Sequence, residues 1–291
     1  MPLTLNQRIK KDLTDLYNGG NTPGEIQEAL NLNRQLSGQS GMISFATKAL
    51  PGYYAGKRDA KTFMIMINPG VDISLANSNL KCDICKRSMK NASDDTNYHL
   101  SSENYGNRDK YRYDSFDVKQ AFFLHKWSNT GIQLPRNLCA NPLSKRQILL
   151  DAKEKVLTEK MQMDLLPYAS ASFNGLNKAK LSLLIPFLET VFEEILSHDR
   201  TYVIFCSNIF KDLFDEYNKS HPNTIQTVNK LTKKIGNSKI QGKCTKVTIK
   251  YNNKLITAII AHTFASRALS TAYKLMEDYG DICYNTYINK P

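Results

Sequence analysis

A chain of 291 residues with 41% hydrophobic side chains can build a buried core, so a wholly disordered protein is excluded. Its longest apolar runs, Phe63–Ile67 and Ile256–Ala261, have only the length of a strand, which excludes a membrane-spanning helix. The net charge of +12, from 39 basic and 27 acidic residues, indicates a polyanionic partner. The first residues contain no apolar secretory segment, so we expect a cytoplasmic protein that does not associate with membranes.

Residues 1–60 have the pattern of a helical segment. Apolar residues recur at helical spacing from Leu5 to Leu16, and a Gly-Gly pair then ends that helix. Thr22 and Glu25 follow with the spacing of an N-cap and its capping-box glutamate, and a proline stands between them. We therefore expect a second helix to begin there and to run toward Leu32.

The first core strand is predicted by the continuous apolar run Thr62–Ile67, which ends at Asn68 because a Pro-Gly turn follows. Residues from about 74 to 114 lose all periodicity and are rich in Asn, Ser, Asp, Lys and Tyr, so we expect a polar insertion there. Asn252 and Asn253 favour a hairpin turn. The remaining pattern predicts helices at 115–127, 144–161, 176–197, 208–217 and 266–279, and strands at 163–168, 202–206, 246–251 and 255–261.

Alternation of buried strands with helices predicts an α/β fold, a three-layer αβα sandwich with a mainly parallel central sheet. No internal repeat and no linker divides the chain. We therefore expect a single domain over residues 1–291, with the helical N-terminal segment 1–60 and the polar insertion at about 74–114.

Polar residues directly follow two of the predicted strands. Asn68 comes after the first strand and His262 after the last one. Ligands of open α/β sheets bind at the carboxyl ends of the strands, so both residues are candidates for a functional site. An asparagine held between a buried strand and a Pro-Gly turn can orient a water molecule or hold a ligand carbonyl, although an amide cannot act as a base. The same residues are also typical of an ordinary strand-end turn.

The segment Phe63–Gly70, Phe-Met-Ile-Met-Ile-Asn-Pro-Gly, resembles the first motif of the uracil-DNA glycosylase superfamily, especially its mismatch-specific and single-strand-selective branches. His262–Ser266 is similar to the second motif of that family. Tyr202–Tyr217 is similar to its third core strand and the following helix. The resemblance extends from about residue 62 to 279 and implies a uracil-DNA glycosylase-like sandwich.

The resemblance implies a monofunctional DNA glycosylase, which flips a uracil-like or modified pyrimidine nucleotide, hydrolyses its N-glycosidic bond and leaves an abasic site. Asn68 would position the attacking water, and His262 would face the departing base. Asp72 is a second candidate for activating water. Thr263 and Phe264 differ from the residues that are usual in the second motif. The residues after Gly70 lack the aromatic that stacks on uracil in that family, and together with the polar insertion this favours a remodelled pocket. One candidate substrate is glucosylated hydroxymethylcytosine, which some members of the superfamily remove from phage DNA in antiviral defence.

Residues near the two motifs are candidates for contacting the substrate. A flipped base needs a surface to stack on, and a side chain can fill the space that it leaves in the duplex. Phe264 and Arg267 are candidates for that wedge, although Phe264 could equally pack under the last helix as core. The candidate substrate-binding residues are Ile67, Pro69, Gly70, Tyr168, Phe264, Ser266 and Arg267.

The excess positive charge is concentrated in one stretch of the sequence. No acidic residue occurs between Glu216 and Glu277, whereas lysines recur throughout. Solvated surfaces normally mix both signs, so we expect this stretch to bind DNA phosphates. A lysine-rich solvated face is the alternative. The candidate contacts to the DNA backbone are Lys230, Lys233, Lys234, Lys239, Lys243 and Lys246.

Cys82 and Cys85 form a Cys-x2-Cys pair, but a zinc site needs a second pair that the sequence does not supply. We expect no metal and no other cofactor, with these two cysteines as the one open candidate. DNA is the expected partner, and nothing indicates an obligate protein partner. Two other functions fit: a non-catalytic DNA-binding protein that retains the glycosylase fold, and an α/β enzyme unrelated to DNA, such as a nucleoside hydrolase. The stretch without acidic residues argues against the second of these.

Overall fold

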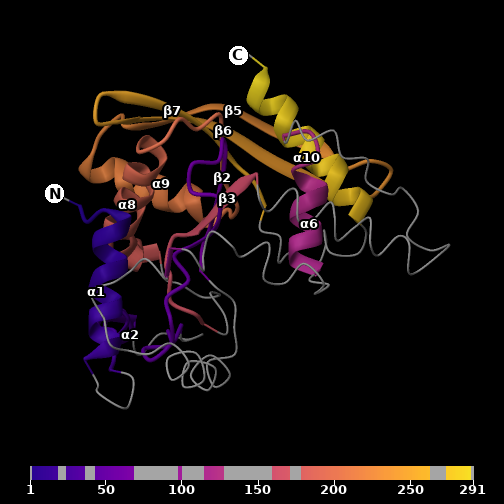
Figure 1. Ribbon diagram of the computed structural model, residues 1–291. Coiled ribbons are helices and arrows are strands. Elements are labelled where there is room, and N and C mark those ends of the chain that lie inside the picture. Colours follow the sequence, from indigo (N-terminus) through magenta and orange to yellow (C-terminus); the bar gives the residue numbers. More distant parts are fainter. Residues whose placement is uncertain are drawn as a thin grey trace, which may run out of the picture. The chain divides into compact units, whose positions relative to one another are not determined.

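The computed structural model of the chain describes residues 2–18, 24–36, 43–68, 98–99, 115–127, 159–170, 178–262 and 273–289 (Figure 1). Its helices are α1 (Leu5–Tyr17), α2 (Gln27–Leu36), α6 (Ser115–Phe123), the 3-10 helix η1 (Lys178–Leu184), α8 (Ile185–Leu196), α9 (Ile209–Ser220) and α10 (Tyr273–Ile288). Its strands are β1 (Tyr54–Gly56), β2 (Thr62–Met66), β3 (Lys160–Asp164), β4 (Tyr202–Phe205), β5 (Ile225–Lys234), β6 (Gln241–Tyr251) and β7 (Lys254–Ile260). None of the described helices has the length and apolar character needed to cross a membrane.

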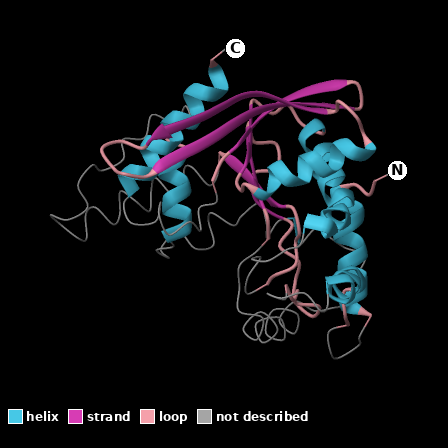
Figure 2. Ribbon diagram, turned by 180° about the vertical axis from the view of Figure 1, so that it is seen from behind, coloured by secondary structure: helices cyan, strands magenta, loops and turns pink. Residues whose placement is uncertain are grey.

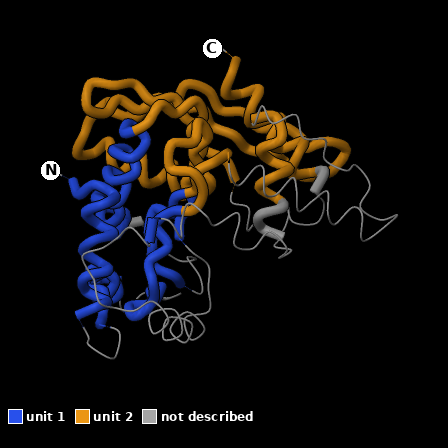
Figure 3. Tube along the Cα trace, viewed as in Figure 1, with its two compact units in different colours: residues 1–54, 66–101, 163–197 blue, residues 55–65, 102–162, 198–291 orange. Residues whose placement is uncertain are grey.

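The chain divides into two compact units (Figure 3). Unit 1 comprises residues 1–54, 66–101 and 163–197, and unit 2 comprises residues 55–65, 102–162 and 198–291. Each unit is built from segments that are far apart in the sequence, so its packing depends on contacts across the whole chain.

The strands form one seven-stranded sheet in the order β1-β3-β2-β4-β7-β6-β5. β4 pairs in parallel with β2 and with β7, whereas β6 pairs antiparallel with β5 and with β7. Figure 2 shows the three long strands β5, β6 and β7 side by side. The predicted α/β content is confirmed, but the predicted mainly parallel sheet is wrong, because no helix separates β5, β6 and β7 and short turns join successive strands antiparallel.

The centre of the sheet in unit 2 is fully apolar. All five residues of β2 are buried, and Ile65 pairs with Phe205 of β4, which pairs in turn with Ile260 of β7. Strands that are buried on both sides are expected to be continuous apolar runs rather than alternating ones. This explains why β2 and β4 could be located from the sequence within two residues of their observed ends.

The β6–β7 hairpin is confirmed. Asn252 and Asn253 connect the strands with φ angles of 46° and 60°, and Tyr251 pairs with Lys254 across the turn. Two successive left-handed residues give the two-residue turn whose twist matches that of the strands, and asparagine adopts this conformation more readily than most residues.

Helices α6 and α10 of unit 2 pack closely against each other at Gly280. A Cβ atom on Gly280 would lie 2.1 Å from the carbonyl oxygen of Phe123, so the two helices approach more closely than any other residue permits. The Gly280 carbonyl accepts a hydrogen bond of 3.2 Å from Nε1 of Trp127. Trp127 also contacts the rings of Tyr202, Tyr284 and Tyr287, with centroids 5.4 to 5.6 Å away.

Unit 1 is organised around α1 and α8. Thr4 and Gln7 form a capping box at the start of α1, whose apolar residues face the core. Arg8 is buried on the same side, where Nε donates to Thr190 at 2.6 Å and the guanidinium lies 4.2 Å from the ring centroid of Phe187. Hydrogen bonds and ring contact together compensate the loss of hydration of this charge.

Several predicted element boundaries are wrong. The strands predicted at 163–168 and 246–251 are β3 and β6, which begin at Lys160 and Gln241, and the last helix runs beyond 279 to Ile288. The second helix begins at Gln27, where the Asp15 carboxylate accepts the backbone N–H at 2.9 Å, rather than near Thr22. The predicted helix at 176–197 is interrupted, because Pro186 lies in the first turn of α8 and the preceding residues form η1. The predicted helix at 144–161 does not reach its end, since Lys160 and Met161 belong to β3.

Candidate functional site

The carboxyl ends of β2, β4 and β7 lie along one edge of the sheet. Residues Ile65, Phe205 and Ile260 are in register, and the backbone N–H groups of the residues that follow β4 and β7 continue the pairing. Cys206 donates to Ile65, and Ala261 donates to Phe205, each at 2.8 Å. The positions of the polar residues that follow these strands are therefore set by the register of the sheet.

His262 follows β7 in unit 2 and has a protein partner at each ring nitrogen. Nε2 accepts the backbone N–H of Lys243 at 3.1 Å, and Nδ1 lies 3.3 Å from the side-chain nitrogen of Asn208. Burial lowers the pKa of His262 below 6.5, and the charges of Lys211 and Lys243 lower it further. The ring is therefore neutral near pH 7, and only one of its nitrogens can accept a hydrogen bond. With Nε2 accepting from Lys243, Nδ1 carries the proton, and it pairs with Asn208 when the amide oxygen is the atom that faces it.

Tyr279 of α10 fixes the backbone on both sides of this ring. Its hydroxyl donates to the Lys243 carbonyl at 2.6 Å and accepts the backbone N–H of His262 at 2.7 Å. The pKa of Tyr279 is raised well above 10, chiefly by burial, so the hydroxyl remains protonated and can make both bonds. Neither this role nor that of Asn208 is visible in the sequence, because both depend on contacts between distant elements.

Lysines from three elements lie near one another, and two of them, Lys211 and Lys243, also act on His262. Lys211 lies in the first turn of α9, Lys230 lies on β5, and Lys243 lies on β6. Burial lowers the pKa of Lys211, and the positive charges of Lys230 and Lys243 lower it further. Lys230 and Lys243 were predicted from the sequence as contacts to DNA, whereas Lys211 was not, because it precedes the stretch without acidic residues.

The six predicted phosphate contacts differ in their surroundings. Lys230, Lys233, Lys234, Lys239 and Lys243 are exposed. Lys246 is only 9% exposed, and its Nζ donates to the carbonyls of Tyr287 and Asn289 at 2.6 and 2.9 Å. The prediction for Lys246 is therefore wrong: its charge is used at the carboxyl end of α10, where it interacts favourably with unpaired carbonyls and with the helix dipole.

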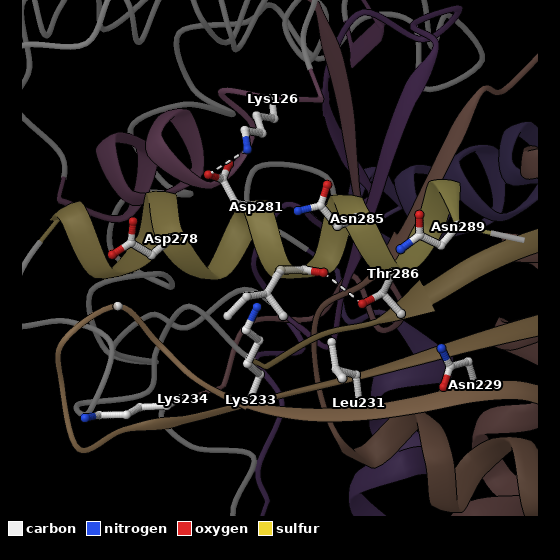
Figure 4. A pocket seen from close by; sticks show the side chains of 12 residues that line it. Lys126, Asn229, Leu231, Lys233, Lys234, Asp278, Asp281, Asn285, Thr286 and Asn289 are labelled. Carbon is white, nitrogen blue, oxygen red and sulfur yellow. Dashed lines mark hydrogen bonds and ion pairs between the residues drawn. The ribbon is translucent and has the colours of Figure 1, made fainter. Parts of the chain in front are cut away.

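A polar cleft of about 550 Å³ lies between β5 and α10 of unit 2 (Figure 4). Asn229 and Lys233 line it from the strand, and Asn285 and Asn289 line it from the helix. At one side, Lys126 and Asp281 form an ion pair of 2.9 Å. Amide and lysine side chains of the cleft can hydrogen-bond polar ligands, and Asp278 and Asp281 add two carboxylates to its lining.

Asn68 belongs to unit 1, where its amide nitrogen contacts two neighbouring residues. Nδ2 donates to Ser170 Oγ at 2.6 Å and to the Tyr168 carbonyl at 3.5 Å, and Ser170 is buried. Fixing the amide nitrogen also fixes the direction of the amide oxygen, the group that could accept a hydrogen bond from a water molecule. The preceding Ile67 is half-buried, and its carbonyl accepts the N–H of Leu166 at 2.8 Å.

Tyr168 was predicted to contact the substrate, but it lies in the core of unit 1. It is 1% exposed and packs edge-on against Phe45 and Phe187, with ring centroids 6.2 Å apart in both pairs. The prediction of a surface for base stacking at this residue is therefore wrong, because both neighbouring rings are already internal. Tyr168 contributes to the site only through the carbonyl that contacts Asn68.

Several predicted residues lie outside the described part of the chain: Pro69, Gly70, Asp72, Phe264, Ser266, Arg267, Cys82 and Cys85. Among the residues that the structure describes, no group of three or more histidine, cysteine or acidic side chains is arranged to hold a metal ion. His262 and Asn68 belong to different units, and each has been described within its own unit.

Comparison with known proteins found no matching family model, no matching curated protein and no matching solved structure.

Proposed function

We propose that the protein is a DNA glycosylase, which flips a pyrimidine-type nucleotide and hydrolyses its N-glycosidic bond. The observation that carries this proposal is that β2 and β7 lie on either side of β4 and that each pairs with it in parallel. The two strands that precede Asn68 and His262 therefore run toward the same edge of the sheet, as expected for the two motifs that resemble the uracil-DNA glycosylase superfamily. The three-layer arrangement of that superfamily is part of the proposal.

The chemistry requires a placed water and stabilisation of charge. Water adds to C1′ of the sugar while the C1′–N bond breaks, and the bonding electrons leave with the base, which then takes up a proton. Asn68, with its amide nitrogen held by Ser170, would direct its oxygen at the water. The DNA phosphates can share in stabilising the cation-like sugar, so a strong protein nucleophile is not needed. His262 would donate to the departing base from Nδ1 only after that nitrogen leaves Asn208.

The test compares Asn68→Ala with the wild type on duplexes that carry uracil, mismatched thymine or glucosylated hydroxymethylcytosine. Abasic sites are cleaved with alkali and quantified. We expect base release to slow by about 100-fold or more, since one positioning group is lost, while DNA affinity stays within a few-fold. Asn6→Ala, an exposed substitution on α1 in the same unit, is the matched control. Equal rates for Asn68→Ala and Asn6→Ala would exclude Asn68 from the reaction.

A second candidate is a non-catalytic DNA-binding protein with the same fold. It is favoured by the ring of His262, whose nitrogens contact Asn208 and Lys243 rather than standing open toward a base. Under this alternative, the wild type binds the three duplexes and a plain duplex with similar affinity. It then leaves no abasic site in any of them.

A further inference from the structure

We propose that Lys211, Lys230 and Lys243 of unit 2 form a site for one phosphodiester group of a nucleic acid strand, beside His262. The proposal rests on the proposed function only in taking a nucleic acid as the partner. Lys211 was not among the lysines predicted from the sequence to contact DNA. With Lys211, three named lysines of the basic region form one discrete site.

Strand register brings two of the lysines together. Lys230 pairs with Thr245 and Lys243 pairs with Thr232, so the two lysines are diagonal neighbours on adjacent antiparallel strands. Residues in such a position lie on the same face of a sheet, about 7–8 Å apart. The opposite face of β6 is covered by α10, because Gly242 lies against Tyr279. Lys243, next in sequence, points away from α10.

The third lysine is tied to this face through a chain of contacts. The Lys211 backbone N–H donates to the Asn208 carbonyl at 3.1 Å, and the Asn208 side chain lies 3.3 Å from His262. The other ring nitrogen of His262 accepts the backbone N–H of Lys243. The first turn of α9 and the start of β6 therefore meet at the histidine ring. This places Lys211 near the face of the sheet that carries Lys230 and Lys243.

No carboxylate of the described residues forms an ion pair with any of the three lysines. The charged groups that face Lys211 are the two other lysines, which lower its pKa, and Asp212, whose opposing effect is smaller. Mutual repulsion without a counter-charge costs free energy, and a bound anion would remove that cost.

A phosphodiester strand fits this site better than a free anion. Lys234 follows Lys230 by four residues, or about 13 Å along β5, and borders the cleft beside α10. Exposed Lys239 then follows in the turn to β6. Positive charges that repeat along a strand match a ligand whose negative charges also repeat, as in a nucleic acid backbone.

The experiment measures binding of a fluorescent single-stranded and a double-stranded oligonucleotide by anisotropy between 50 and 200 mM KCl. Lys211→Gln and Lys243→Gln are compared with Lys250→Gln, a control with the same charge change at an exposed position of β6. The control lies seven residues, or about 23 Å, from Lys243. We expect each site variant to weaken binding several-fold and to flatten the slope of log K against log salt by about 0.7–0.9, while Lys250→Gln stays close to the wild type.

A second readout follows His262 by NMR. Because an anion beside the ring favours its charged form, oligonucleotide binding should raise the pKa of His262 in the wild type and less so in Lys211→Gln. Inorganic phosphate at matched ionic strength should neither reproduce this shift nor displace the oligonucleotide at low millimolar concentration. If it does both, the site belongs to free phosphate and the assignment to nucleic acid is overturned. Equal losses in Lys211→Gln and Lys250→Gln would also overturn it, since bulk charge would then suffice.

Base release is scored separately in the same samples. Oligonucleotide binding that depends on the lysines, without base release, supports the phosphodiester site and refutes the proposed glycosylase activity. If Lys211→Gln releases the base at the wild-type rate and binds the oligonucleotide with wild-type affinity, the glycosylase activity is supported and the phosphodiester site is refuted.

Discussion

Asp12 lies on the buried side of α1 and accepts a hydrogen bond of 2.8 Å from the Tyr53 hydroxyl. Burial raises the pKa of Asp12 from 3.8 to about 6, against the opposing effect of that hydrogen bond. A carboxyl whose pKa is higher in the folded than in the unfolded protein stabilises the fold when it is protonated. Its contribution is complete below about pH 4 and is lost as the pH rises through 6.

Asp12→Asn should remove this pH dependence. The difference between 3.8 and about 6 corresponds to about 3 kcal/mol, so the wild type should lose up to that amount relative to the variant between pH 4 and 7. Urea unfolding at intervals of half a pH unit measures the difference. Parallel stability curves for the two proteins would show that Asp12 ionises normally in the fold.

The candidate site was predictable only in part at the level of residues. Asn68 and His262 could be named because each directly follows an apolar strand, and strand ends are visible in a sequence. Tyr279 and Lys211 could not be named, because their roles come from contacts between elements that are distant in the sequence. Lys246 was misassigned for the same reason, since its carbonyl partners lie about 40 residues away.

At the level of elements, predictions succeeded where burial is uniform and failed where it is not. β2 is buried throughout and apolar after Thr62, β4 is buried after Tyr202, and the hairpin turn has two asparagines that accept positive φ angles. β5 was missed as a strand, because most of its ten residues are exposed and it lacks the alternation that identifies a half-buried strand. The helical break before α8 comes from Pro186, which suits a first turn but not a helix interior.

The contact of α10 with α6 gives a second prediction, at Gly280. Gly280→Ala places a Cβ against the Phe123 carbonyl, so the helices must separate and we expect a loss of about 1–3 kcal/mol. Asn285→Ala, on an exposed position of α10, should have little effect. Thermal unfolding followed by the fluorescence of Trp127, the only tryptophan of the chain, measures both variants. Equal melting temperatures for the two variants would contradict the close helix contact.

At the scale of the whole molecule, the alternation of predicted strands and helices correctly indicated α/β content but not the direction of pairing. The alternation of strands and helices in the first two thirds of the chain suggested a parallel sheet, and β2, β4 and β7 follow that pattern. The last third places three strands in succession, which reverses the pairing beyond β7. Direction depends on what connects two strands, and here β5 had not been recognised as a strand.

The lysines of β5 also bear on self-association of the protein. β5 is the last strand in the sheet order, so it offers a long row of backbone donors and acceptors to any strand from a second molecule. Positive charge along that row discourages such addition while the protein is free in solution. Lys233→Gln combined with Lys234→Gln should therefore raise light scattering at low salt above that of the paired control Lys250→Gln with Lys254→Gln. Equal scattering would refute the idea. If it holds, a polyanion that covers these lysines also removes a barrier to self-assembly, and bound molecules could cluster along it.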